Sequence, residues 1–420
     1  MQIEIGYGFE SRTAEVPDKN VRGVLYANKT EQTRPPEDLI RGALAGPTGS
    51  RRLCELAKGK RRVAVITSDI TRPMPTGAVM PLVLEELNRA GVPDSAITLV
   101  FAVGSHRRHT REEMKKLAGD EAFSRIRCVD ADDRDFVHLG ETRHGTPVDV
   151  TRTVAEADLR VCIGNIEFHW FAGYSGGAKA IMPGVSTRAA IQINHSLLTE
   201  RASVVRNADS PVRLDIEEAI TYCPIDFILN VVLDEHKRIV HAVAGHYIEA
   251  HRAGCRVLDA MYAKPIPEEA DIVLVSQGGM PKDLNLYQMQ KALDNARHAV
   301  RKGGIIIWVG CAKEGFGEAV FEEWMLSADS PASILRRIQA DFCIGGHKAA
   351  GIALTLEQAD IFLVSDLEDD LTRRIFMTPF HDLQQALDEA LRRRGPEAGV
   401  LVMPYGGSTL PVLDQKLNSR

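Results

Sequence analysis

Residues 61–104, RRVAVITSDITRPMPTGAVMPLVLEELNRAGVPDSAITLVFAVG, decide the fold class of this 420-residue chain. The segment begins with an apolar run over 61–69, continues with a helix pattern over 76–91 and ends with an apolar run over 96–104. Gly91 marks the predicted end of the helix. Near-continuous apolar strands joined by helices are typical of a parallel sheet covered on both faces. We therefore expect an α/β fold.

The same alternation continues along most of the chain. A helix is predicted over 109–119, where Thr110 and Glu113 form a capping box, and a hairpin over 227–245. A second strand–helix series begins near residue 270, which predicts two α/β domains. Each is expected to hold a mainly parallel sheet covered by helices, with the active site in the cleft between them.

The expected boundaries are 1–265 for an N-terminal, cofactor-binding domain and 270–399 for a C-terminal domain. The two prolines of KPIPEE predict a linker near 264–270. The tail, about 400–420, is a candidate extra strand that can return to the first domain.

Composition excludes several classes of protein. The net charge of −6 comes without a long basic stripe, which argues against nucleic-acid binding. No apolar run reaches a membrane-spanning length, and the start MQIEIGYGFE lacks the features of a secretory signal. The 7 cysteines are dispersed without a CxxC pair, as expected for buried thiols in a reducing compartment. We expect a cytoplasmic protein.

Ionisable side chains follow the predicted strands, where ligands bind in open parallel sheets. In the first series these are Asp69, Arg72, His106, His169 and Lys179. The two histidines are either structural or an acid/base pair that acts on opposite faces of a substrate. Arg72 is either an exposed loop residue or a grip on a carboxylate or phosphate.

The segment 173–184, GYSGGAKAIMPG, is the most unusual in the chain. Its glycines let backbone N–H groups approach an anion, and a helix starting after them would add its dipole. It is not a Walker A loop, because Lys179 is followed by Ala180. Lys179 is expected either to grip a phosphate or to be tied covalently to a ligand. His195 cannot hold a metal alone, but one imidazole can complete a metal bound mainly by a cofactor.

Five blocks in order, SDITRPMP, GSHR, EFHWFAGYSGGAKAIMPGV, INH and GGMPKDLNLYQMQK, resemble the nickel-pincer lactate racemase family. The similarity runs over most of the chain. The resemblance implies a racemase or epimerase that inverts C2 of a 2-hydroxy acid, lactate or a larger one. It also implies proteins that synthesise the cofactor as partners.

The resemblance further implies roles for single residues. Lys179 would hold, through a thioamide, a pyridinium-3,5-bisthiocarboxylic acid mononucleotide that carries nickel, and His195 would supply a further nickel donor. His106 and His169 would be the catalytic acid/base pair, while hydride passes to the cofactor and back. The other cofactor contacts would be Asp69, Ile70, Thr71, Arg72, Gly176 and Gly177. The substrate contacts would be Arg72, Gln288 and Lys291.

Two other functions are considered from the residues. An NAD-type 2-hydroxy acid dehydrogenase lacks support, because we find no good dinucleotide fingerprint. A two-domain protein that merely binds a carboxylic acid would not need paired histidines. His347 and Lys348 are candidates for contacts to extra substrate hydroxyls or a second carboxylate, or else form a surface turn before a helix.

Overall fold

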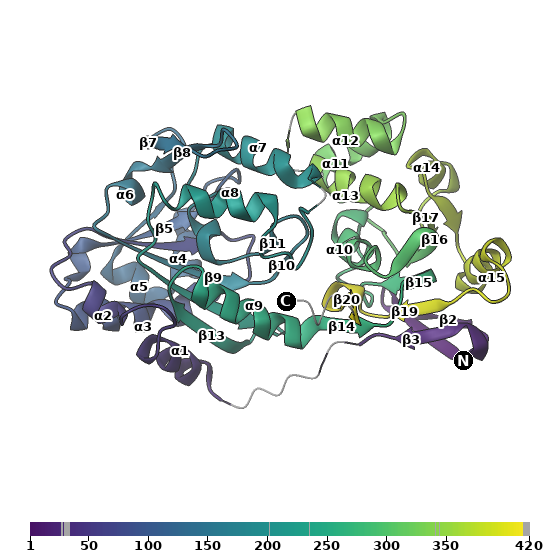
Figure 1. Cartoon of the computed structure of the whole chain (residues 1–420), viewed down its shortest axis with the longest axis horizontal. Coiled ribbons are helices and arrows are strands. Elements are labelled where there is room, and N and C mark those ends of the chain that lie inside the picture. The colour runs from purple at the N-terminus through teal and green to yellow at the C-terminus, as the bar shows by residue number, and fades with distance from the viewer. Residues whose placement is uncertain are drawn as a thin grey trace. The chain divides into compact units, whose positions relative to one another are not determined.

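The computed structural model describes residues 1–26, 28, 34–200, 202–234, 236–340, 342–343 and 345–414 (Figure 1). The chain divides into two compact units. The central unit is Thr30–Ala260, and the terminal unit combines Met1–Lys29 with Met261–Arg420. Each unit contains a 6-stranded sheet with helices around it, so the predicted α/β class is confirmed.

The sheet of the central unit has the order β13-β12-β9-β4-β5-β6. All neighbouring pairs are parallel except β12 and β13, which form the predicted antiparallel hairpin. Its core is apolar on the strands themselves, as in β4, where Val63, Val65 and Ile66 are buried. The strands are β4 (Val63–Ser68), β5 (Ile97–Ala102), β6 (Arg127–Asp130), β9 (Leu159–Ile166), β12 (Phe227–Leu233) and β13 (Ile239–Gly245).

The strand order of this sheet reverses between β4 and β9. From β4 the chain adds β5 and β6 on one side, whereas β9 lies on the other side of β4 and is followed by β12. A crevice forms at such a reversal, outside the carboxyl ends of the strands, and ligands bind there in open α/β sheets. Residues 69–72 follow β4 and residues 167–184 follow β9, so both segments singled out above lie at this switch point.

Helices of the central unit begin and end much as the sequence predicts. In α4, Thr110 accepts the N–H of Glu113 and closes the predicted capping box, and Gly119 follows the helix at φ 79°. In α3, the apolar residues Val79, Val83 and Leu87 are spaced by four and buried. The helices are α1 (Pro36–Ala45), α2 (Leu53–Leu56), α3 (Thr76–Arg89), α4 (Arg111–Ala118), α5 (Asp120–Arg125), α6 (Arg152–Ala155), α7 (Arg188–Ser196), α8 (Pro211–Ala219) and α9 (Glu249–Tyr262, which ends in the terminal unit).

The central unit also contains two short antiparallel pairs, which lie outside the main sheet. These are β7 (Phe136–Glu141) with β8 (Pro147–Thr151), and β10 (Phe168–His169) with β11 (Gly173–Tyr174).

The terminal unit has a parallel sheet of order β18-β17-β16-β15-β19-β3. Its strands are β3 (Val21–Val24), β15 (Ala270–Ser276), β16 (Val300–Val309), β17 (Ala359–Val364), β18 (Thr378–Phe380) and β19 (Val400–Met403). Its helices are α10 (Leu286–Ala296), α11 (Ala319–Ser327), α12 (Pro331–Ala340), α13 (Gly346–Leu356), α14 (Asp369–Arg374) and α15 (Leu383–Arg394).

This division differs from the expected boundaries 1–265 and 270–399 at both ends of the chain. The hairpin of β1 (Gln2–Tyr7) and β2 (Glu10–Glu15) belongs to the terminal unit, where β3 pairs with β19. The tail also stays in the terminal unit, because β19 pairs with β15. Residues 415–420 of the tail lie outside the described residues.

The expected linker near 264–270 is instead partly a strand. Residues Ala263–Ile266 form β14, which pairs in parallel with β20 (Leu410–Leu413). The prolines do not prevent this, since a two-stranded pair leaves one side of each strand without a sheet partner.

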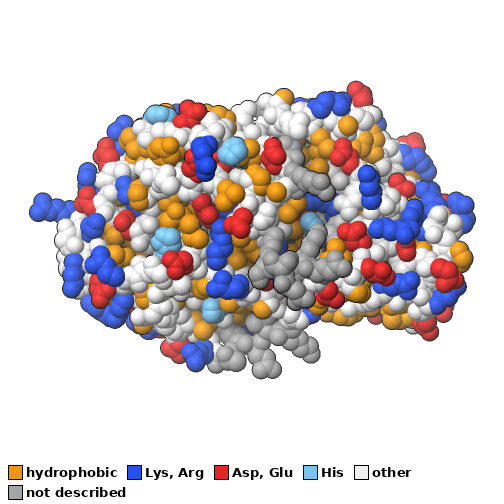
Figure 2. Space-filling model, viewed as in Figure 1, with side chains coloured by type: hydrophobic (Ala, Val, Ile, Leu, Met, Phe, Trp, Pro, Cys, Tyr) orange, Lys and Arg blue, Asp and Glu red, His pale blue; other side chains and the backbone are white. Residues whose placement is uncertain are grey.

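No helix among the described residues combines the length and apolarity that crossing a bilayer requires. On the face shown in Figure 2, acidic and basic side chains are intermixed. All seven cysteines are free thiols, and burial raises the pKa of Cys128 to about 11 and that of Cys255 to about 12.

Candidate active site

The carboxyl ends of β4 and β5 bring together Asp69 and His106. The Asp69 carboxylate is buried and accepts a hydrogen bond from His106 Nδ1 at 2.5 Å and one from Thr71 Oγ1 at 2.8 Å. Burial raises the pKa of Asp69, but the hydrogen bonds from His106 and Thr71 outweigh it and lower the pKa below the usual value. In the neutral form of His106, a proton on Nδ1 that points to Asp69 leaves the lone pair on Nε2.

Sequence reasoning missed His109, which fixes the turn after β4. His109 Nδ1 lies 2.6 Å from Asp130 Oδ1, and its Nε2 accepts the backbone N–H of Ile70 at 3.0 Å. The imidazole is almost fully buried. The side chains of Ile70, Thr71 and Arg72 are exposed on this turn. His109 therefore holds the backbone of the predicted cofactor-contact stretch.

One aromatic ring joins three of the predicted residues. The buried ring of Phe171 lies 4.5 Å from the ring of His169 and 5.1 Å from that of His195, centre to centre. Lys179 Nζ lies 5.7 Å from the centre of the same ring. Arg72 lies close enough to this group for its positive charge to lower the pKa values of both His169 and Lys179.

The environment of Lys179 favours a neutral amine. Burial, then the guanidinium of Arg213 and then that of Arg72 hold its pKa well below the usual value for lysine. A larger share of the amine is therefore uncharged at neutral pH, which is the form that acts as a nucleophile. Lys179 is nevertheless only partly covered by the protein, so that a small molecule can reach it.

His169 is likewise held neutral. Its pKa lies well below the usual value, first because of burial and then because of nearby positive charges, Lys179 foremost. Its Nδ1 accepts the N–H of Ala172 at 3.3 Å, which leaves the proton of the neutral ring on Nε2. The neutral forms of the two rings therefore differ at Nε2, which is an acceptor in His106 and a donor in His169.

The glycines of the loop 173–184 are required by its backbone. Gly176 and Gly177 have φ values of 76° and 59°, and a Cβ on Gly176 would lie 2.9 Å from Asn230 Oδ1. The N–H of Gly177 is donated to Asn230 Oδ1 at 2.8 Å rather than pointing at a ligand. The helix expected after the glycines is a short 3₁₀ turn, Gly177–Ala180, so no long helix directs its dipole here.

His195 has the tautomer that metal binding requires. It is buried at the end of α7, and its Nδ1 lies 3.1 Å from Asn194 Oδ1. The Asn194 amide donates to Asp215 and to the carbonyl of Val212, so its oxygen must accept from His195. The lone pair is consequently on Nε2. Within the described part of the chain, no three His, Cys, Asp or Glu side chains gather as a metal site.

The remaining predicted residues lie in the terminal unit. Gln288 and Lys291 have exposed side chains one turn apart on α10. His347 and Lys348 are in the first turn of α13 rather than in a loop before it. Lys348 donates to Gln290 at 3.0 Å, so it contacts α10.

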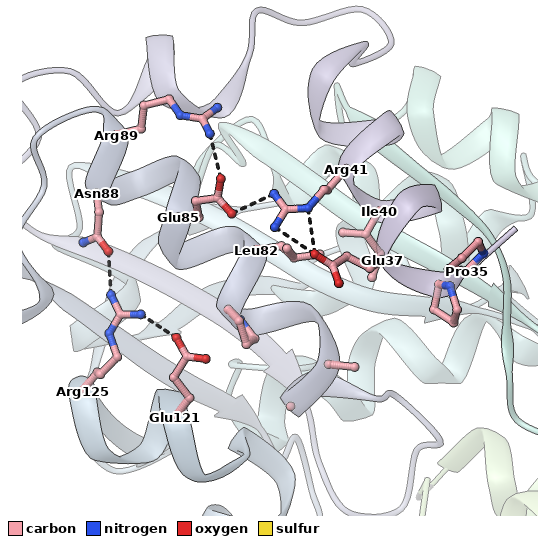
Figure 3. Close-up of a pocket in the computed structure, with 14 residues that line it drawn as sticks. Pro35, Glu37, Ile40, Arg41, Leu82, Glu85, Asn88, Arg89, Glu121 and Arg125 are labelled. Carbon is pink, nitrogen blue, oxygen red and sulfur yellow. Dashed lines mark hydrogen bonds and ion pairs between the residues drawn. The ribbon is translucent and has the colours of Figure 1, made fainter.

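A separate groove of about 890 Å³ is lined by α1, α3 and α5 of the central unit and holds none of the predicted residues (Figure 3). Its charges neutralise one another: Arg41 pairs with Glu85 at 2.8 Å, and Arg125 pairs with Glu121 at 2.7 Å. Among the described residues, the charged side chains that line the groove are therefore paired.

Known proteins of one family match nearly the whole chain. The family model described as the lactate racemase N-terminal domain matches residues 7–205, and that of the lactate racemase C-terminal domain matches residues 266–410. The lactate racemase of Thermoanaerobacterium thermosaccharolyticum is 32% identical, with 97% of this chain and 98% of that protein covered. The lactate racemase of Lactiplantibacillus plantarum is also 32% identical, with 96% and 98% covered.

Solved structures also match the chain over nearly its whole length. The structure of the lactate racemase apoprotein from T. thermosaccharolyticum matches with a TM-score of 0.87 and 31% identity, covering 98% of this chain and 100% of that one. A protein from Thermotoga maritima matches with a TM-score of 0.63 and 16% identity, covering 92% and 100%, which shows a shared fold.

Proposed function

The chain belongs to the lactate racemase family and is therefore a racemase, and on that premise we propose that it inverts C2 of a 2-hydroxy acid, lactate or a larger one. The observation that carries the proposal is the group at the switch point of the central sheet. There the Asp69–His106 pair follows β4 and β5, and His169, Lys179 and His195 surround Phe171.

We assign to this site the nickel-pincer mononucleotide that the family resemblance implies. The residues present fit such a group: Lys179 offers a partly neutral amine for a thioamide bond, and His195 presents an Nε2 lone pair to a metal. Since the described residues gather no complete ligand set, a metal here needs donors from a bound group. The chemistry that this group supplies when bound is reversible acceptance of a hydride.

His106 is proposed to take the hydroxyl proton of one enantiomer at Nε2. The Asp69 carboxylate on Nδ1 orients the ring and stabilises the imidazolium that forms. The guanidinium of Arg72, three residues beyond Asp69, is proposed to hold the substrate carboxylate. Ile70 and Thr71 complete this turn against the cofactor, and His109 keeps its backbone in place.

His169 is proposed to serve the opposite face of the substrate. Its ring is neutral without substrate, and a neutral imidazole is a poor acid. To act as an acid, the ring must first take a proton from solvent on Nδ1, which releases the hydrogen bond from Ala172. The incoming carboxylate adds a negative charge near His169 that favours this protonated ring, whose Nε2 proton can then pass to the alkoxide. Proton transfer on this face thus depends on the charge of the substrate.

Further contacts and partners are proposed from the resemblance. Gln288 and Lys291 are proposed to contact the substrate, and Gly176 and Gly177 the cofactor. Proteins that synthesise the nucleotide are the proposed partners, in the cytoplasm. His347 and Lys348 are the residues whose replacement tests whether the substrate carries extra polar groups.

The proposed function is tested with the cofactor-loaded chain, a panel of enantiopure 2-hydroxy acids and chiral chromatography. We expect inversion of at least one acid, with deuterium at C2 retained in the product because hydride does not exchange with water. Rapid loss of the label to solvent would contradict hydride transfer. Absence of inversion across lactate and its larger aliphatic, aromatic and dicarboxylic homologues would contradict the function itself.

A further inference from the structure

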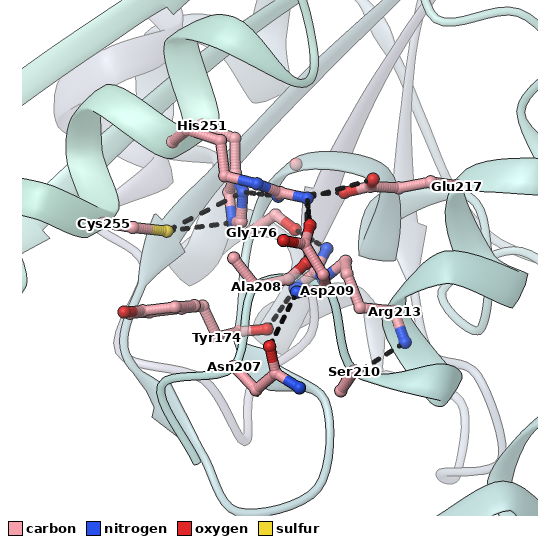
Figure 4. A network of polar contacts seen from close by, with 12 residues as sticks. Tyr174, Gly176, Asn207, Ala208, Asp209, Ser210, Arg213, Glu217, His251 and Cys255 are labelled. Carbon is pink, nitrogen blue, oxygen red and sulfur yellow. Dashed lines mark hydrogen bonds and ion pairs between the residues drawn. The ribbon is translucent and has the colours of Figure 1, made fainter. Parts of the chain in front are cut away.

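Arg213 of helix α8 binds the backbone of the loop that leads to Lys179, at Tyr174 and Gly176 (Figure 4). The Arg213 side chain is fully buried, and its two terminal nitrogens donate to the carbonyls of Tyr174 and, at 3.3 Å, Gly176. Its Nε has no hydrogen-bond partner among the described residues. Burying a guanidinium against carbonyls is costly, so the fold retains a positive charge that its own acidic groups do not neutralise by contact.

A second side chain of α8 acts on the same loop through a relay (Figure 4). Glu217 accepts a hydrogen bond from Arg252 at 3.0 Å and forms an ion pair with it at 2.9 Å. Arg252 donates to His251 Nδ1 at 3.0 Å, and His251 Nε2 then donates to the carbonyl of Ser175 at 2.7 Å. With Arg213, the carbonyls of three consecutive residues, 174 to 176, are each bound by a buried donor.

A third side chain of α8 acts on His195. The buried carboxylate of Asp215 accepts hydrogen bonds from the hydroxyls of Thr142 and Thr146 and from the Asn194 amide at 2.8 Å. These bonds orient the Asn194 amide, whose oxygen accepts from His195 Nδ1. Asp215 therefore determines, through one intermediate, which nitrogen of His195 carries the lone pair.

We propose that α8 is a positioning helix for cofactor loading, in which Arg213 acts on Lys179 through the loop and Asp215 acts on His195 through Asn194. The two residues are separated by one position, and the helix lies between the stretches 7–205 and 266–410 that the family models match. The proposal rests on the proposed function only for the identity of the group that Lys179 and His195 hold.

Besides binding the loop backbone, Arg213 acts on the Lys179 amine through its charge. The titratable and charged groups around Lys179 are Arg213 on α8, Arg72 after β4, His169 on β10 and His251 on α9. Burial lowers the pKa of Arg213 to about 10, so it stays positive at neutral pH. A fixed positive charge beside Lys179 disfavours protonation of the amine, which leaves it ready to be acylated.

The Lys179 arm is tested on the full-length chain produced without the cofactor-synthesis proteins. The chain is labelled with trace acetic anhydride from pH 6 to 11, and peptide masses give the labelling of Lys179 relative to exposed Lys116. The variant is Arg213→Met, and the matched control is Leu214→Ala, an exposed residue on the same helix. Racemisation is not read out, so the result stands whether or not the proposed function is correct.

We expect the labelling profile of Lys179 to move to higher pH in Arg213→Met, with a 3- to 10-fold lower rate at pH 7.5, which corresponds to about half to one pKa unit. Leu214→Ala should match the wild type. Superimposable profiles for wild type and Arg213→Met would overturn the proposal. If Arg213→Met does not fold, the pH profile of Lys179 labelling in the wild type is used instead. A Lys179 that titrates like an ordinary exposed lysine in the wild type would overturn the proposal.

The His195 arm is tested on the same cofactor-free chain by ¹⁵N NMR of labelled histidines. We expect His195 in the wild type and in Leu214→Ala to show a proton on Nδ1 only, and Asp215→Ala to show a mixture of tautomers. An unchanged single tautomer in folded Asp215→Ala would overturn this arm. A wild-type His195 protonated on Nε2 would overturn it without any variant.

Discussion

The groove of Figure 3 and the loop support of Figure 4 both gather arginines, but they treat the charge in opposite ways. In the groove, Arg41 is exposed and Arg125 is half-buried, and each pairs with carboxylates. Under the loop, Arg213 is fully buried and binds carbonyls. Exposed ion pairs contribute little to the stability of the fold. Burying a guanidinium costs desolvation free energy, so a buried arginine of this kind suggests a role for its charge. The volume of the groove therefore does not mark it as an active site, because its charges are paired, whereas the charge of Arg213 lacks a carboxylate partner among the described residues.

The largest expected effect comes from the acid/base residues beside the loop. His106→Ala and His169→Ala should each lower kcat by about 10²- to 10⁴-fold in both directions, because each removes one proton transfer. Chiral assay of the loaded variants measures this, with Arg41→Ala in the groove as the control that keeps full activity. A variant of either histidine with wild-type turnover in both directions would refute the pair.

The next effect concerns stability. Arg213→Met leaves the carbonyls of Tyr174 and Gly176 without their buried donor, which should destabilise the fold by about 1–3 kcal/mol in urea unfolding. Arg41→Met, which removes only the exposed ion pairs with Glu37 and Glu85, should leave the urea midpoint nearly unchanged. Equal midpoints for the two variants would erase the contrast between the two regions.

A smaller effect is expected on how the free energy of unfolding changes at acid pH. The pKa of Asp69 is lower in the folded protein than its ordinary value, so its contribution is complete above the unfolded pKa and is lost as pH falls through the folded one. Between about pH 4 and pH 2 the wild type should therefore lose stability more steeply than Asp69→Asn. Parallel stability curves for the two proteins over this range would show that the His106 pair does not lower the pKa.

The smallest effect is expected from salt acting on the groove. Arg125 is half-buried and pairs with Glu121 and Asp94, and salt of about 0.5 M screens such pairs in part. Arg125→Gln should therefore differ from wild type slightly at low salt and less at high salt. Thermal unfolding at both salt concentrations measures this. A salt-independent loss would mean that Arg125 is more than a solvated surface residue.

The sequence predicts what is local in the fold. The strands β4 and β5 and the helix between them follow from apolar runs, and the capping box at Thr110 follows from two residues three positions apart. The placement of β3 beside β19 does not follow, because pairing of the two chain ends leaves no signal in either short segment.

The site divides in the same way. Motif spacing is enough to single out Lys179, but Arg213 lies in VRLDIEE, where nothing distinguishes it from a surface arginine until the loop folds onto it. The contact of His109 with Asp130 could have been predicted from the sequence. Both residues lie near the carboxyl ends of β5 and β6, which are neighbours in the sheet. The sequence analysis expects the glycines of 173–184 to let N–H groups approach an anion, whereas the N–H of Gly177 is donated to Asn230.

The central claim, that this region is built to hold a nucleotide on Lys179, is tested most directly by the mass of the active protein. Intact and peptide masses of catalytically active chain should show a nucleotide-sized addition on Lys179, absent from an inactive Lys179→Ala variant. Racemisation at the wild-type rate by an unmodified chain, or by Lys179→Ala, would contradict the account.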